Sequence, residues 1–174
     1  MRYDGPLLKA EATQHLASCH AAEGDAAGAI EKYGSAIAAM EALGPPGQKR
    51  LCSCHHDLAG LLAVEVLGAP GSKLRRLRDA ADQRLPRVAE AGLKKALRHA
   101  ATALRLAERA HGRASNATAQ MHFAVGKLAR DARVFSPAIY HLGQSTLINY
   151  HFFVGYGGVD AHPDVDRAST ERRS

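Results

Sequence analysis

Apolar residues recur three and four positions apart along most of the chain, and short stretches rich in Gly and Pro separate these segments. This spacing places the apolar residues on one face of a helix, whereas a strand would place them at every second position. We expect a first helix over residues 5–23, a turn at Gly24-Asp25, and a second helix over 25–43. The predicted apolar face of the first helix consists of Leu8, Ala12, Leu16, Cys19 and His20.

The same pattern continues beyond residues 44–47, a Gly-Pro-Pro-Gly stretch that is predicted to end the second helix. Further helices are expected over 48–67, from Pro86 to Ala110, over 116–133, and over 137–153. The helix over 48–67 has its apolar stripe at Leu51, Cys54, Leu58, Leu61, Leu62 and Val66. Residues 69–85 form a basic segment that interrupts this succession of helices. The spacing of its Leu residues over 72–85 predicts a short amphipathic helix.

The second predicted helix has Ala29, Tyr33 and Ala36 on one face. Small residues at this spacing let a neighbouring helix approach closely, and the aromatic ring fills the space beside them. This arrangement resembles the second helix of a tetratricopeptide (TPR) repeat, whose pattern has Ala, an aromatic residue and Ala at these positions. The later helices carry related triplets at Ala96, Ala100 and Ala103, and at Ala138, Leu142 and Ser145.

The interval from Ala96 to Ala138 is 42 residues, longer than the roughly 34 of an ordinary TPR. It is similar to the TPR variety of kinesin light chains and to the C-terminal helical repeats of SET-and-MYND methyltransferases, although the chain lacks the catalytic domain and zinc-binding cysteine clusters of those enzymes. The resemblance implies an all-α, TPR-like superhelix of about three antiparallel helix pairs over 6–43, 48–111 and 116–154. Insertion 69–85 would lie within the second pair. This domain is expected over residues 1–165, followed by a polar tail over 166–174.

Composition supports closely packed helices, because Ala and Leu dominate and aromatic residues make up only 5%. A formal net charge of +6 makes an acidic partner plausible. Three cysteines without framework spacing fit a reducing compartment. The first residues show no secretory or transit pattern, and no apolar run reaches the roughly 20 residues that span a bilayer. We therefore expect a soluble, cytoplasmic protein without a transmembrane segment, in an undetermined organelle or the cytosol.

Cysteine and histidine cluster at Cys52, Cys54, His55 and His56. On a helix, Cys52 would point the same way as His55 or His56, and thiolate and imidazole groups are zinc ligands. A tetrahedral site needs four ligands, and only Cys19 and His20 could complete it. The main interpretation is a packed cysteine beside solvated histidines, and a metal site or a Cys/His nucleophile is the alternative. No cofactor, metal or catalytic residue is therefore assigned.

Three surfaces are candidates for partner binding. The resemblance places the first helix of each pair on the concave side, where Gln120, Phe123, Lys127 and Arg130 would face a groove suited to an acidic or amphipathic peptide. These residues could equally form a solvated helix face. Residues Arg75, Arg76 and Arg78 could form a docking surface, a solvated helix, or a nucleic-acid or membrane contact. Tyr150 and Phe153 belong to an aromatic cluster that could dock a protein or pack back on the last helix pair.

Together these features predict a non-catalytic protein–protein interaction module, either a scaffold, an adaptor or an accessory subunit of a larger assembly. Nucleic-acid binding is disfavoured because the chain has neither a recognisable module nor stacking aromatics beside its basic segment. The competing hypotheses are an enzyme or metal protein centred on the Cys/His cluster, and nucleic-acid binding through the basic insertion.

Overall fold

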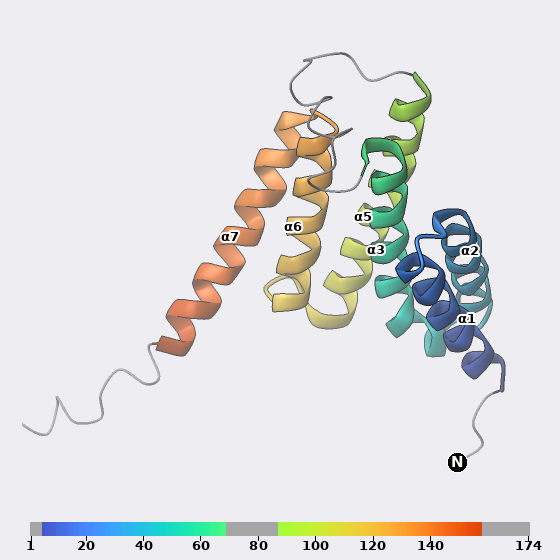
Figure 1. Cartoon of the computed structure of the whole chain (residues 1–174). Coiled ribbons are helices and arrows are strands. Elements are labelled where there is room, and N and C mark those ends of the chain that lie inside the picture. Colours follow the sequence, from blue (N-terminus) through green and yellow to red (C-terminus); the bar gives the residue numbers. More distant parts are fainter. Residues whose placement is uncertain (1–4, 69–86, 158–174) are drawn as a thin grey trace, which may run out of the picture.

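The described part of the computed structural model covers residues 5–68 and 87–157, and it is entirely helical (Figure 1). Its elements are α1 (Gly5–Ala22), α2 (Ala26–Ala42), α3 (Pro45–Leu67), α5 (Arg87–His111), α6 (Asn116–Asp131) and α7 (Phe135–Gly157). Each helix runs antiparallel to the next and packs against it, so the pairs α1–α2, α3–α5 and α6–α7 follow one another across the molecule. The predicted all-α class is confirmed. The basic insertion over 69–85 and the polar tail over 166–174 lie outside the described residues.

Local sequence explains where the helices begin. The Asp25 carboxylate caps α2 by accepting a hydrogen bond from the Gly28 amide at 2.9 Å, and the Ser115 hydroxyl caps α6 by accepting one from the Thr118 amide at 3.1 Å. Gly44 adopts a positive φ of 66° between α2 and α3. The predicted start of α3 at residue 48 was too late, because Pro45 is accommodated in the first helical turn.

The Ala29-Tyr33-Ala36 triplet and the related triplet on α5 lie at the helix interfaces. Ala29, Tyr33 and Ala36 are buried, and so are Ala96, Ala100 and Ala103 on α5. Gly126 on α6 meets α7 so closely that an added Cβ would lie 2.8 Å from Leu142 Cγ. The small residues therefore bring the helix axes together, as their spacing predicted.

The predicted apolar face of α1 was wrong. Leu8 and Leu16 are 47% and 48% exposed, whereas Ala10, Gln14 and Ala17 face the neighbouring helices. The physical reason is that α1 lies close to α2 and also touches α3, so that its inner side has room only for small residues. Gln14, the one long side chain among the buried residues of α1, is accommodated because its amide donates a hydrogen bond to Ser53 Oγ at 3.0 Å.

Two pairs of histidines connect neighbouring helices: one joins α3 to α5, and the other joins α6 to α7. In the α3–α5 histidine pair, the Nδ1 atoms of His55 and His99 are 2.8 Å apart. In the α6–α7 histidine pair, the Nδ1 atoms of His122 and His141 are 2.9 Å apart. A hydrogen bond at this distance requires a proton on one Nδ1 and a lone pair on the other, so at least one ring of each pair is neutral. Burial lowers the pKa of all four imidazoles, which favours their neutral forms.

Candidate functional site

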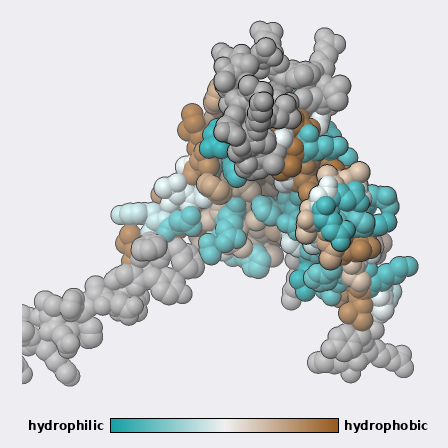
Figure 2. All heavy atoms as spheres, viewed as in Figure 1, coloured by the Kyte–Doolittle hydropathy of each residue, from teal (hydrophilic) through white to brown (hydrophobic). Residues whose placement is uncertain are grey.

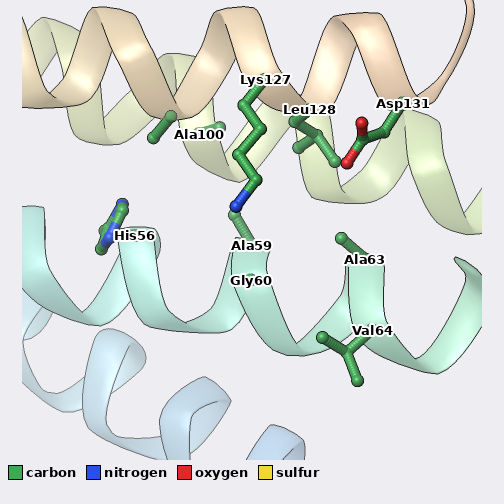
Figure 3. A pocket seen from close by; sticks show the side chains of 10 residues that line it. His56, Ala59, Gly60, Ala63, Val64, Ala100, Lys127, Leu128 and Asp131 are labelled. Carbon is green, nitrogen blue, oxygen red and sulfur yellow. The ribbon is translucent and has the colours of Figure 1, made fainter. Parts of the chain in front are cut away.

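A cleft of about 260 Å³ lies between α3 and α6, with α5 contributing to its floor. Figure 3 shows the α3 and α6 walls facing each other across this space. Most of its lining is apolar and small, which leaves an open hollow where larger side chains would have filled the gap. The lining residues are His56, Ala59, Gly60, Ala63, Val64, Ala100, Ala124, Lys127, Leu128 and Asp131.

The rim of the cleft carries charge. The Lys127 side chain extends from α6 towards Ala59 and Gly60 of α3 (Figure 3). Within the described ranges, no carboxylate oxygen lies within 4.0 Å of its ammonium group. On the same helix, the Arg130 guanidinium holds Asp131 Oδ1 at 3.0 and 3.2 Å. The cleft therefore combines an apolar floor with a cation that can form an ion pair with a carboxylate of a ligand.

Of the four residues predicted to face a groove, only Lys127 lines this cleft. Gln120, Phe123 and Arg130 are exposed on α6 but are not among the lining residues. Sequence analysis missed the α3 wall, which consists of Ala59, Gly60 and Ala63 together with Val64. The available signal was a run of small residues one turn apart on α3, but the same pattern is also typical of a buried helix contact.

A hydrogen-bonded network holds the middle of α3, where Asp57 lies between the cleft-lining residues His56 and Ala59. The Tyr33 hydroxyl lies 2.9 Å from Ser18 Oγ on α1 and donates to Asp57 Oδ2 on α3 at 3.3 Å. Burial raises the pKa of both Tyr33 and Asp57, and the Tyr33 hydrogen bond partly opposes the shift at Asp57. One hydroxyl thus joins three helices and holds α3 in place beside the cleft.

The four side chains of the Cys/His cluster do not converge on one point. The Cys52 thiol donates to the Ala103 carbonyl at 3.3 Å, the Cys54 thiol contacts Met40 Sδ at 3.8 Å, and His55 pairs with His99. His56 instead lines the cleft. Across residues 5–68 and 87–157, no three Cys, His, Asp or Glu side chains gather in a way that could hold a metal ion. Burial raises the pKa of Cys54 to about 11, so its thiol is protonated at neutral pH.

The remaining predicted binding residues are divided between described and undescribed parts of the chain. Tyr150 is 62% exposed on α7, where Ile139, Tyr140, Leu147 and Val154 are exposed as well. Arg75, Arg76 and Arg78, and the side chain of Phe153, lie outside the described residues. The exposed side of α7 is therefore a second candidate surface, separate from the cleft.

Comparison with known proteins gives no assignment: no family model, curated protein or solved structure matches the chain. None of the described helices is both long enough and apolar enough to cross a membrane.

Proposed function

We propose that the chain is a TPR-like helical repeat that acts as a non-catalytic protein-interaction module, serving as a scaffold, adaptor or accessory subunit of a larger assembly. Its interior positions support the repeat. The small residues Ala17, Ala59 and Gly126 of α1, α3 and α6 are separated by 42 and then 67 residues. Ala29, Ala96 and Ala138 of α2, α5 and α7 are separated by 67 and then 42. A surplus of 25 residues between Ala59 and Ala96 accounts for both differences and reduces every interval to 42. It is shared by the segment between α3 and α5 and by the ends of these two helices that adjoin it.

The observation that carries the binding function is the cleft with Lys127 at its rim. The Ala side chains and Leu128 that line the cleft can pack against an apolar side chain of a ligand. The Lys127 ammonium can form an ion pair with a carboxylate of the same ligand. This combination fits a protein segment that presents an apolar anchor beside an acidic residue. The net charge of +6 favours the approach of such a segment over long distances.

The chemistry of the lining also favours binding over catalysis. The ten lining residues include no Ser, Thr, Cys or Tyr, and the one carboxylate among them, Asp131, is held by Arg130. A general acid or base in this cleft would have to be His56 or Lys127, and neither finds a hydroxyl or thiol among the lining residues with which to form a nucleophile–base pair.

The test is selection of peptides from a random displayed library on the full chain, followed by affinity measurements on two matched pairs of variants. Gly60→Leu would fill the cleft from α3, and Gly34→Leu makes the same change at another exposed helical glycine with open space around it. Lys127→Glu would reverse the charge at the rim, and Lys9→Glu makes the same change on α1, away from the cleft.

We expect selected peptides to combine apolar and acidic residues. Gly60→Leu and Lys127→Glu should each weaken binding at least tenfold, whereas Gly34→Leu and Lys9→Glu should retain it. Equal binding by all four variants, or failure to select any peptide, would contradict the function proposed for the cleft.

A further inference from the structure

The outer side of α7 carries an exposed row of residues with the spacing of a coiled-coil seam. Tyr140, Gly143, Leu147, Tyr150 and Val154 are separated by three, four, three and four positions, and all five are exposed. Such alternation repeats every seven residues and places successive residues along one line of the helix. The inner side of α7, which includes Ala138, Ser145 and Ile148, packs against α6. We call the outer row the α7 seam.

No other described helix covers the α7 seam. In Figure 1, α7 forms one edge of the molecule, and α6 is the described element that packs against it extensively. Hydrophobic side chains line parts of the left edge in Figure 2, where α7 lies. The seam is therefore free of extensive packing by any other helix in the described ranges.

Charge restricts what that partner can be. The 23 residues Phe135–Gly157 contain no Asp, Glu, Lys or Arg, in a chain with 40 such residues. An acidic protein held by ion pairs would find no cation on this helix, and an anionic membrane surface is normally bound through Lys and Arg. The partner surface should therefore be uncharged and apolar, and a second copy of α7 meets both conditions.

Gly143 indicates how a second helix would fit. Glycine within a helix lowers its stability relative to alanine, so it usually has a packing reason. Among the residues that the structure describes, Gly143 has none, because a Cβ added there would meet nothing within 4 Å. The glycine instead leaves a notch in the α7 seam, one turn before Leu147 and about two turns before Tyr150.

We propose that the chain forms a homodimer in which the α7 seams of two copies pack antiparallel, with the two Leu147 side chains meeting at the centre. In this arrangement Tyr150 of each copy fills the Gly143 notch of the other, and Tyr140 lies opposite Val154. On both sides of the central Leu147 pair, a tyrosine then faces a smaller residue. A parallel pair would place Gly143 against Gly143 and Tyr150 against Tyr150, leaving a gap in one layer and crowding in the other.

The dimer would leave the binding cleft free, because none of the α7 side chains that the structure describes lines it. Each dimer would carry two clefts, so a partner with two binding segments would gain avidity. A single helix seam lies at the low end of interface sizes, so we expect a dissociation constant on the order of 10 µM. Each copy carries a net charge of +6, and screening of their mutual repulsion should strengthen association as salt is added.

The test is sedimentation velocity of the full chain over a concentration series that extends well above the expected dissociation constant. Leu147→Glu places two like charges at the centre of the seam. Leu16→Glu is its matched control, because Leu16 on α1 is 48% exposed and Leu147 is 49% exposed. We expect wild type and Leu16→Glu to reach twice the 18.5 kDa chain mass, and Leu147→Glu to stay monomeric with unchanged helical circular dichroism.

Orientation is tested by charge pairing across the seam. Tyr140→Glu and Val154→Lys should each weaken the dimer, and the double variant should restore it, because residue 140 faces residue 154 only in the antiparallel arrangement. A monomeric wild type, which would leave the seam to a different partner, overturns the proposal. Dimerisation of Leu147→Glu, loss of the dimer in Leu16→Glu, or failure of the double variant to restore association would also overturn it. None of these readouts uses a cleft ligand, so the dimer and the proposed function can fail independently.

Discussion

Replacement of Gly126 by alanine should destabilise the fold, because this glycine sets the distance between α6 and α7. An added Cβ would lie 2.8 Å from Leu142 Cγ, 3.0 Å from its Cδ2, and 2.9 Å from the backbone nitrogen of the same residue. The side chain of Leu142 can change its rotamer, but the backbone nitrogen can move only if α7 moves. The substitution therefore forces the two helices apart along a contact that is otherwise close-packed.

The expected magnitude follows from two opposing effects. Overpacking of this kind costs about 1–3 kcal/mol. The gain in helix propensity from glycine to alanine returns about 0.5–1 kcal/mol. The net loss in the free energy of unfolding should be about 0–2.5 kcal/mol, which lowers the Tm of a chain of this size by at most roughly 10 °C.

Gly34→Ala provides the matched control. Gly34 lies in the middle of α2 and is exposed, and no atom of the described part of the chain lies within 4 Å of an added Cβ. Only the propensity gain applies there, so the free energy of unfolding should rise by about 0.5–1 kcal/mol. Urea unfolding followed by far-ultraviolet circular dichroism measures both changes. If Gly126→Ala is as stable as Gly34→Ala, then α6 and α7 do not approach as closely as the structure shows, and this reasoning is refuted.

Three further predictions concern buried polar groups. The two histidine pairs have imidazole pKa values below the ordinary 6.5, so the unfolded chain binds more protons than the folded chain as the pH falls below that value. Urea midpoints should therefore be nearly constant between about pH 7 and pH 8, below the range where unfolded thiols ionise, and should decline below about pH 6.5. His141→Phe should reduce the slope of this acidic decline. Tyr33→Phe should lower the free energy of unfolding by about 1–3 kcal/mol, because the half-buried Asp57 loses its donor; an unchanged urea midpoint would show that the network contributes nothing. N-ethylmaleimide should modify the exposed Cys19 first and should reach the buried Cys54 only after unfolding, as peptide mass spectrometry would detect, and rapid labelling of Cys54 would contradict its packing against Met40.

The starts of α2 and α6 could be predicted from the sequence because local residues determine them. Gly24-Asp25 and Ser115 are turn and capping residues whose effect acts within a few positions, and the periodic apolar stripe of α3 identified its buried face. The face of α1 could not be predicted in the same way. Its large residues suggested burial of Leu8 and Leu16, but helices that pack closely bury small residues, and the sequence does not state how close two helices will come.

The candidate site was harder to predict than the fold, because the cleft exists only where three different helices all lack large side chains. Lys127 was identified from its position on α6, but the cleft exists because Ala59, Gly60 and Ala63 leave space on α3. Nothing in the local sequence distinguishes small residues that make room for a neighbouring helix from those that leave a hollow. The histidine pairs were missed for a related reason, since their members are 44 and 19 residues apart.

The most direct test of the central claim is backbone amide chemical-shift mapping of the full chain, titrated with the tightest-binding selected peptide. The account predicts the largest shifts at Ala59, Gly60, Ala63 and Lys127, with smaller changes on the outer side of α7. Saturable shifts confined to α1 or α7, with the cleft residues unaffected, would show that binding occurs elsewhere and would contradict the assignment of the cleft as the binding site.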